Sequence, residues 1–556
     1  MLNSKFLKLT FYALPLAFFA LFYFYPLAAI FGLSFAPEKH LDLSALAKLT
    51  DTPYYLKTLW FTIWQATLST LLTLLLAMPG AYVFARYRFW SKNTLKTLST
   101  LPFVLPTVVV ANAFTALLGP RGLLNQGMMS LFNLSQPPVQ IHHTIWMILL
   151  AHIFYNYSVA LRIISGYWQN LNPNVEEAAQ LLGASPIKVF RRVTLPLLMP
   201  AINAAGMLVF IFCFSSFGVV LILGGPQYAT LEVEIYRQAV NLFNLPTAAA
   251  LSIIQIIFTF GLMRVYSRSQ TQMARPLNRQ SSRSLQRPVK SWRDRLIVVG
   301  NLALMLLLLG TPLLALVLRS FSGANGLTLR YYRELFINRQ GSLFFVPPAE
   351  AIFNSIAFAL ATVVLAALLG MISALLLTRE THRWRGWLDA LFMLPLATSA
   401  VTLGFGYIIA LGRPPLNLRS SLLLVPVAHT LIAIPFVIRS LLPAMRSINP
   451  KLREAAATLG ATPRRAWLAV DWPLIQRALL VGAVFAFTIS MGEFGATLFI
   501  ARPQTPTMPV AIYRFLGQPG ALNYGQALAM SALLMLVCAI GFIAIERFQL
   551  GDEGEF

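Results

Sequence analysis

The chain has 556 residues, of which 57% are apolar and only 11% charged, and its formal net charge is +24. Soluble globular domains carry about 25% charged residues, so this chain cannot cover a water-facing surface of its size and must lie mostly in lipid. Its basic residues cluster in short loops beside apolar segments, as in loops held on the cytoplasmic side of a membrane. We therefore do not expect the positive charge to bind nucleic acid.

Twelve apolar segments are long enough to cross a bilayer core, which takes about 20 residues in a helix. The segments are continuous rather than alternating, which excludes a transmembrane β-barrel and predicts an all-α fold. The first segment is too long for a signal-peptide core, so we expect it to stay in the mature protein. The predicted spans are 11–34, 57–85, 99–118, 144–166, 199–224, 246–265, 296–318, 352–378, 388–411, 421–442, 478–500 and 525–546.

Basic residues also predict the orientation of the spans. The loops after the second and fourth spans are rich in Lys and Arg, and residues 264–295 hold nine basic residues and a single acid, Asp294. If the spans alternate, these loops share one side, which should be the cytoplasm. We therefore expect a multi-pass protein of the bacterial inner membrane with both termini cytoplasmic.

The segment 268–291 is rich in Ser, Gln, Arg and Pro. Such a composition cannot bury an apolar core, so it predicts a flexible basic linker without packing contacts. The linker separates a first domain, residues 1–267, from a second domain, residues 292–556, and each domain has six predicted spans.

The two domains are repeats of one another. His152 and His429 are separated by 277 positions (429 − 152), and the same offset relates Asn172–Pro173 to Asn449–Pro450 and Phe217–Gly218 to Phe494–Gly495. Both domains begin in the same orientation, which predicts a parallel repeat about an axis normal to the membrane. A substrate path is then expected between the two domains.

The most specific pattern lies in two cytoplasmic loops at equivalent places in the repeat, residues 172–196 and 449–473. Each begins with Asn-Pro, which predicts a capped helix start, and continues with Glu-Ala-Ala and a glycine that ends the helix. The glutamate is expected near the positive end of this short helix, and the small alanines leave room for another protein to approach the backbone. The residues of the pattern are Glu177, Ala178, Ala179, Gly183 and Pro196 in the first loop and Glu454, Ala455, Ala456, Gly460 and Pro473 in the second.

This pattern resembles the coupling loop of the permease subunits of binding-protein-dependent ABC importers, although Trp472 stands where the second loop would have Leu. The resemblance covers the whole chain as two fused permease domains and implies the type I ABC importer permease fold. It also implies that two copies of an ATP-binding cassette subunit dock on the loops. A periplasmic or lipid-anchored binding protein would deliver the solute.

No Gly-x-x-x-x-Gly-Lys-Ser/Thr motif occurs in the sequence, so the chain has no phosphate-binding loop for ATP. We interpret it as a transport subunit rather than an enzyme, with ATP hydrolysed by a separate chain. Its two cysteines, Cys213 and Cys538, lie in apolar segments without metal-ligand spacing. No cofactor or metal is expected.

Two segments bear on the substrate. The segment from Phe212 resembles fused thiamine permeases, which are similar in layout to fused ferric-iron permeases, and the segment from Ser490 also resembles permeases for oxyanions. Glu493 is an acid inside a predicted span, where charge usually faces a cavity or a partner. Its repeat equivalent is Ser216, and both are candidates for the substrate path, although a salt bridge or helix cap is the favoured role of Glu493. His152 and His429 are expected to make interhelical hydrogen bonds.

Thiamine is therefore the expected solute, with ferric iron or an oxyanion as the alternative. A function of another class, an ion-coupled secondary transporter, would share the architecture of two parallel repeats. It would require acids inside the spans or broken helices to bind the coupling ion, and Glu493 is the one acid that stands out. It would also leave the duplicated loops without a role.

Overall fold

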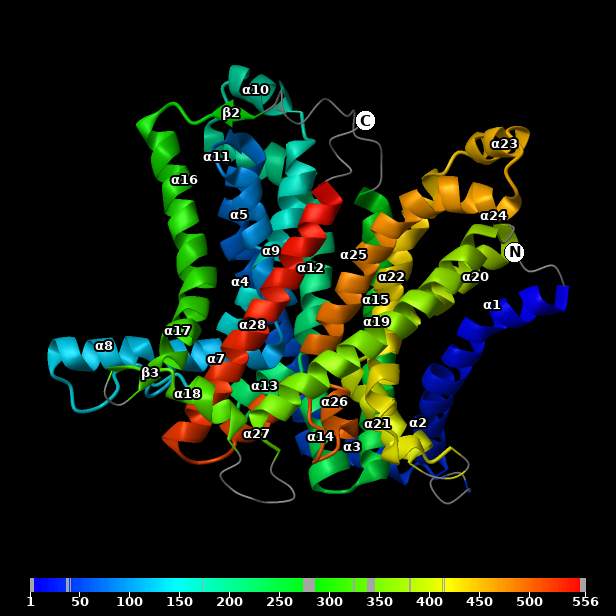
Figure 1. Cartoon of the computed structure of the whole chain (residues 1–556). Coiled ribbons are helices and arrows are strands. Elements are labelled where there is room, and N and C mark those ends of the chain that lie inside the picture. The colour runs from blue at the N-terminus through cyan, green and yellow to red at the C-terminus, as the bar shows by residue number, and fades with distance from the viewer. Residues whose placement is uncertain are drawn as a thin grey trace.

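The computed structural model of the chain describes residues 5–36, 40, 42–172, 174–273, 286–323, 326–337, 346–379, 382–412, 414 and 416–550. Among these residues, eleven helices are long and apolar enough to cross a membrane, and a pair of helices bent by 95° makes a twelfth span. Figure 1 shows the long helices running between two faces of the molecule, with short helices gathered at each face. The predicted all-α fold is confirmed, and each predicted span corresponds to one of these helices.

Each half of the chain supplies six spans. Those of the first half are formed by α1 (Lys5–Phe19) with α2 (Tyr25–Phe35), α4 (Pro53–Arg86), α7 (Thr107–Leu118) with α8 (Leu123–Phe132), α9 (Ile145–Gln169), α12 (Leu195–Phe214) and α15 (Leu245–Met273). Those of the second half are formed by α16 (Trp292–Met305) with α17 (Thr311–Ser320), α19 (Pro348–Arg379), the bent pair α20 (His382–Met393) and α21 (Ala400–Leu411), α22 (Leu424–Ser447), α25 (Trp472–Gly492) and α28 (Ala521–Leu550).

Shorter elements connect the spans. The short α-helices are α3 (Ser44–Asp51), α5 (Lys92–Leu98), α6 (Leu101–Val104), α10 (Asn174–Leu181), α11 (Pro186–Val189), α13 (Gly218–Leu223), α14 (Leu231–Tyr236), α18 (Arg330–Arg333), α23 (Pro450–Thr458), α24 (Pro463–Ala466), α26 (Thr497–Ile500) and α27 (Met508–Leu516). Two-residue strands form two small pairs, β1 (Tyr87–Arg88) parallel to β2 (Arg287–Pro288), and β3 (Ser322–Gly323) antiparallel to β4 (Gly326–Leu327).

Two spans of the first half differ in extent from the hydropathy prediction. The span expected over 199–224 ends at Phe214, and irregular backbone separates it from α13. The span expected over 99–118 runs as α7 only from Thr107, because Pro106 cannot donate a backbone hydrogen bond and holds the residue before it extended. The second half has matching breaks after α25 and before α21. The breaks therefore belong to the repeat, and they place irregular backbone inside the protein.

The first span of each half packs mainly on the other half. α1 contacts α19, and α2 contacts α21 and α15. Equivalently, α16 contacts α4, and α17 contacts α7 and α28. Each first span thus lies against the second and third spans of the other half and against the sixth span of its own. Each half thus packs its first span on the other half, an arrangement that agrees with the predicted parallel repeat. This exchange of first spans joins the halves through apolar helix packing.

The predicted linker lies partly outside the described residues, which omit 274–285. Its last part does make contacts, contrary to the expectation, because Arg287 and Pro288 pair with Tyr87 and Arg88 of the first half. The Tyr87 hydroxyl also donates to the Asp294 carboxylate at 3.0 Å. The β1–β2 pair therefore fixes the start of α16 beside the end of α4.

We expect a cut within 274–285 to leave the transporter assembled, because the exchanged first spans hold the halves together by helix packing. The test co-expresses the two halves as separate chains with a tag on the first and measures whether the second co-purifies in detergent. A matched pair of second halves starts at 286 or at 292, so that the contribution of β2 is measured separately. Halves that never co-purify would show that the linker has a structural role.

Candidate functional site

The two loops that carry the repeated pattern, residues 172–196 and 449–473, fold as the sequence predicts at their described starts and ends. The side-chain oxygen of Asn172 accepts the Asn174 N–H at 3.0 Å, and that of Asn449 accepts the Lys451 N–H at 3.0 Å. Gly183 and Gly460 end the helices with φ of +84° and +78°, in the left-handed region that favours glycine. Beyond them, Pro196 and Pro473 stand in the first turns of α12 and α25, where the chain re-enters the bundle.

The glutamates of the pattern lie early in their helices. Glu177 lies in the first turn of α10 as described, together with Glu176. Glu454 lies four residues after Pro450, where α23 begins. The residue equivalent to Pro450 in the first loop, at position 173, lies outside the described residues.

Polar side-chain contacts hold each loop against the segment that leads into the next span. The sequence did not reveal these contacts. The Glu176 carboxylate accepts from the Arg86 guanidinium at 2.7 Å and from the Thr194 hydroxyl at 3.0 Å. At the equivalent positions of the second loop, the Arg453 guanidinium donates to the Asp471 carboxylate, from its Nε at 2.8 Å. The acid stands at the first of the two equivalent positions in the first loop and at the second in the second loop. A search for identical residues in the two copies therefore misses these contacts.

Both loop helices are exposed at the same face of the molecule (Figure 1). Ala178 and Ala455 are exposed, and neither α10 nor α23 has a buried residue. Leu182 and its repeat equivalent Leu459 are 89% and 88% exposed, and Leu181 is 89% exposed. Large apolar side chains on short polar helices outside the spans are typical of a surface that another protein covers.

A central cavity of about 380 Å³ lies between the two halves. Irregular backbone at both helix breaks lines it, and the rings of Phe217 and Phe494, which are repeat equivalents, stack across it with centroids 5.8 Å apart. Ser216 and Glu493, the two residues predicted for the substrate path, both line this cavity. Its lining residues are Phe103, Thr107, His152, Tyr155, Asn156, Phe212, Ser215, Ser216, Phe217, Gly218, Val219, Glu232, Thr398, Ser399, Ala400, Val401, Gly492, Glu493, Phe494 and Gly495.

Glu493 caps a helix, the role that the sequence favoured. Its two carboxylate oxygens accept the Ala496 N–H at 2.8 Å and the Thr497 N–H at 2.9 Å, at the start of α26. The Thr497 hydroxyl also bonds the carboxylate, and Nε2 of His429 lies 3.3 Å from it. Both oxygens of this acid are therefore occupied by the protein itself.

The two equivalent histidines make the predicted interhelical hydrogen bonds. His152 joins the Ser69 hydroxyl at 2.9 Å to the Ser216 hydroxyl at 2.8 Å. His429 joins the Ser490 hydroxyl at 2.7 Å to the Thr497 hydroxyl at 2.8 Å. Each ring is nearly or fully buried. Each histidine therefore ties the irregular backbone after a fifth span to the rest of its half.

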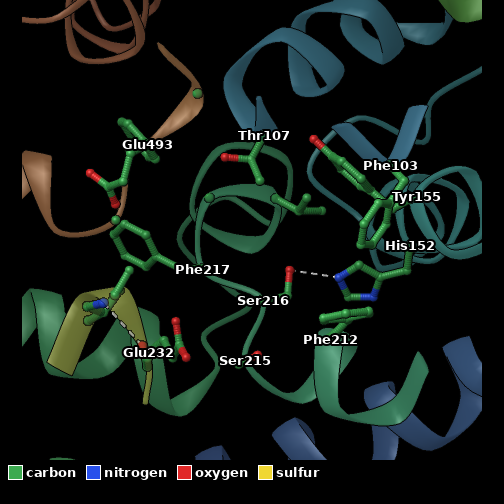
Figure 2. Close-up of a pocket in the computed structure, with 18 of the residues that line it drawn as sticks. Phe103, Thr107, His152, Tyr155, Phe212, Ser215, Ser216, Phe217, Glu232 and Glu493 are labelled. Carbon is green, nitrogen blue, oxygen red and sulfur yellow. Dashed lines mark hydrogen bonds between the residues drawn. The ribbon is translucent and has the colours of Figure 1, made fainter. Parts of the chain in front are cut away.

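A second acid lines the cavity, Glu232 in α14, and the sequence did not reveal it. Hydropathy gives no reason to single it out, because the residues between the fifth and sixth spans have the pattern of a connecting loop. Glu232 is only 2% exposed, and Figure 2 shows it beside Phe217 in the cavity that Glu493 also lines. A signal that could have found it is its place between the apolar residues Leu231 and Val233.

This arrangement defines the membrane-embedded subunit of a transporter: two parallel halves enclose a central cavity and present two exposed helices at one face. Residues 77–275 match the family described as "Binding-protein-dependent transport system inner membrane component". The chain is a fused two-domain permease of a binding-protein-dependent ABC importer, a multi-pass inner-membrane protein that works with ATP-binding and solute-binding partners.

Several proteins that are similar to this chain along most of its length carry the name "Thiamine transport system permease protein ThiP". The protein from Brucella abortus (strain 2308) is 27% identical over 508 residues, covering 89% of this chain and 88% of the relative. That from Escherichia coli (strain K12) is 28% identical over 502 residues, covering 88% of each chain. That from Haemophilus influenzae (strain ATCC 51907 / DSM 11121 / KW20 / Rd) is 26% identical over 550 residues, covering 97% and 96%.

Proposed function

We propose that this permease imports thiamine, delivered from outside by a binding protein. The observation that carries the proposal is the similarity to thiamine permeases through both halves, at 88% to 97% coverage of this chain. A cavity of about 380 Å³ whose lining combines Phe and Tyr rings with a few polar side chains is of a size and character that suit a small organic solute. These relatives do not favour ferric iron, an oxyanion or an ion-coupled secondary transporter.

The partners follow from the two exposed loops. One ATP-binding cassette subunit docks on α10 and a second copy docks on α23, covering the exposed leucines at positions 182 and 459. Residues 1–267 and 292–556 are the two permease domains, and the loops lie in the cytoplasm. Alternating spans put both ends of the chain on the side of α10 and α23, and the described end of α28 points toward that face (Figure 1). Both termini are then cytoplasmic, and a periplasmic or lipid-anchored binding protein meets the opposite face.

The proposed substrate is tested by uptake in cells that lack this chain and in cells in which it is restored. We expect restored cells to accumulate labelled thiamine and to gain no uptake of labelled ferric iron or molybdate. Uptake of iron or molybdate that depends on the chain, without thiamine uptake, would contradict the substrate while leaving the permease class intact.

We also expect the purified chain alone to hydrolyse no ATP, because its sequence has no phosphate-binding loop. The measurement compares phosphate release by the chain alone, by the ATP-binding partner alone and by the reconstituted complex. Stoichiometric turnover by the chain, free of any second polypeptide, would place ATP hydrolysis in this subunit.

A further inference from the structure

Two acids line the central cavity, and they differ in the number and kind of groups that bond their carboxylates. Glu493 has both oxygens occupied by helix N–H groups, a hydroxyl and a histidine. Glu232 accepts one bond from Gln255 Nε2 at 3.1 Å, and Ser399 of the other half lines the same cavity. The hydrogen-bond partner that the described part of the chain gives Glu232 is thus neutral.

No Lys or Arg is among the cavity-lining residues that the structure describes. A carboxylate held out of water without a cationic partner is unfavourable. In membrane proteins, such acids face cavities and lie along the paths of substrates or ions. The repeat equivalent of Glu232 is Pro509, so the second half has no acid at the matching position.

The rings around the cavity add a second feature that points to the same ligand chemistry. Phe217 and Phe494 stack with centroids 5.8 Å apart, and Phe103, Phe212 and Tyr155 also line the space. The faces of aromatic rings attract organic cations, and this attraction strengthens where water is excluded. A buried acid together with several rings therefore matches a flat organic cation better than an anion or a bare metal ion.

We propose that Glu232 is the specificity-determining acid of the central cavity and that it recognises the positive charge of an organic cation. This inference rests on the proposed function, since thiamine carries a permanently charged thiazolium ring. It assigns recognition to Glu232 in α14 and leaves Glu493 with the structural role of a helix cap. Gln255 orients the carboxylate, and residues of the other half, Ser399 among them, line the cavity that it faces, so movement of the halves changes its surroundings.

The test measures equilibrium binding of labelled thiamine to the full chain with its ATP-binding partner in lipid nanodiscs, without the binding protein, which would otherwise dominate the affinity. We expect Glu232→Gln to weaken thiamine binding by roughly 10- to 100-fold, the range for loss of a charge-assisted contact. Glu232→Asp keeps the charge and should retain a preference for thiamine over an uncharged analogue with a reduced thiazole ring.

Glu234→Gln is the matched control, because Glu234 is an equally buried acid of α14 that does not line the cavity. Its carboxylate accepts from the Tyr54 hydroxyl at 2.8 Å and from Gln238 Nε2 at 2.7 Å. We expect this variant to bind thiamine within about threefold of the wild type, well below the change expected for loss of a charge-assisted contact. Co-purification of the ATP-binding partner and a single peak on size exclusion establish that each variant is folded.

Equal thiamine binding by the wild type and a folded Glu232→Gln variant would overturn the role of Glu232 and leave the thiamine proposal intact. If the wild type binds no thiamine, the proposed substrate is wrong, and the inference is judged on 1-methylnicotinamide, a ring cation, against neutral nicotinamide. A preference for the cation that is lost in Glu232→Gln would support the inference. Equal binding of the two ligands by the wild type would overturn it.

Discussion

Replacing Ala178 or Ala455 with tryptophan is expected to uncouple the permease from its ATPase while leaving the chain folded and inserted. Both alanines are exposed on short helices outside the spans, so the larger side chain meets no other part of the described chain. At a close-packed interface, added bulk costs about 1–3 kcal/mol, which is roughly a 5- to 150-fold loss in the docking equilibrium.

The measurement is co-purification of the ATP-binding subunit with each variant, together with uptake of labelled thiamine. The serine variants at the same positions are the matched controls, because serine adds one small atom and should preserve docking. The two loops are tested separately, since Leu181 of the first has Thr458 as its equivalent in the second and the apolar surfaces therefore differ. Normal docking and uptake in both tryptophan variants would mean that the loops are only connectors.

The features predictable from the sequence are those that depend on local composition and on the repeat. Hydropathy over about 20 residues locates the spans, and the constant offset between the copies is enough to pair His152 with His429. The loop helices are predictable because Asn172 and Gly183 act through bonds to their immediate neighbours. These features can be recognised in the sequence because the groups that interact are close to one another along the chain.

The features that escape prediction depend on contacts between distant segments or on breaks within apolar sequence. Glu176 meets Arg86 across 90 positions, and nothing in hydropathy indicates that α2 packs on α21 of the other half. The break at Ser216 lies in residues that would be equally compatible with continued helix. Glu232 escapes prediction for this reason, because its burial follows from the break and not from the residues beside it.

The helix cap made by Glu493 predicts a large loss of stability when that side chain is removed. Glu493→Ala would leave the Ala496 and Thr497 N–H groups without their acceptor in a buried site, while His429 would keep its bonds to Ser490 and Thr497. Each unsatisfied buried donor costs about 1–3 kcal/mol, so we expect a total loss of about 2–6 kcal/mol, comparable to breaking a buried charged pair.

Ser216→Ala is the matched control for this prediction, because Ser216 occupies the equivalent position in the repeat and loses a single bond to His152, at 2.8 Å. A neutral hydrogen bond contributes about 0.5–1.5 kcal/mol, so this variant should unfold much closer to the wild type. The measurement is the thermal unfolding midpoint of each purified variant in detergent, together with the fraction that remains monodisperse. If Glu493→Ala were as stable as Ser216→Ala and lost only thiamine binding, Glu493 would contact the substrate, and the division of roles between the two cavity acids would be wrong.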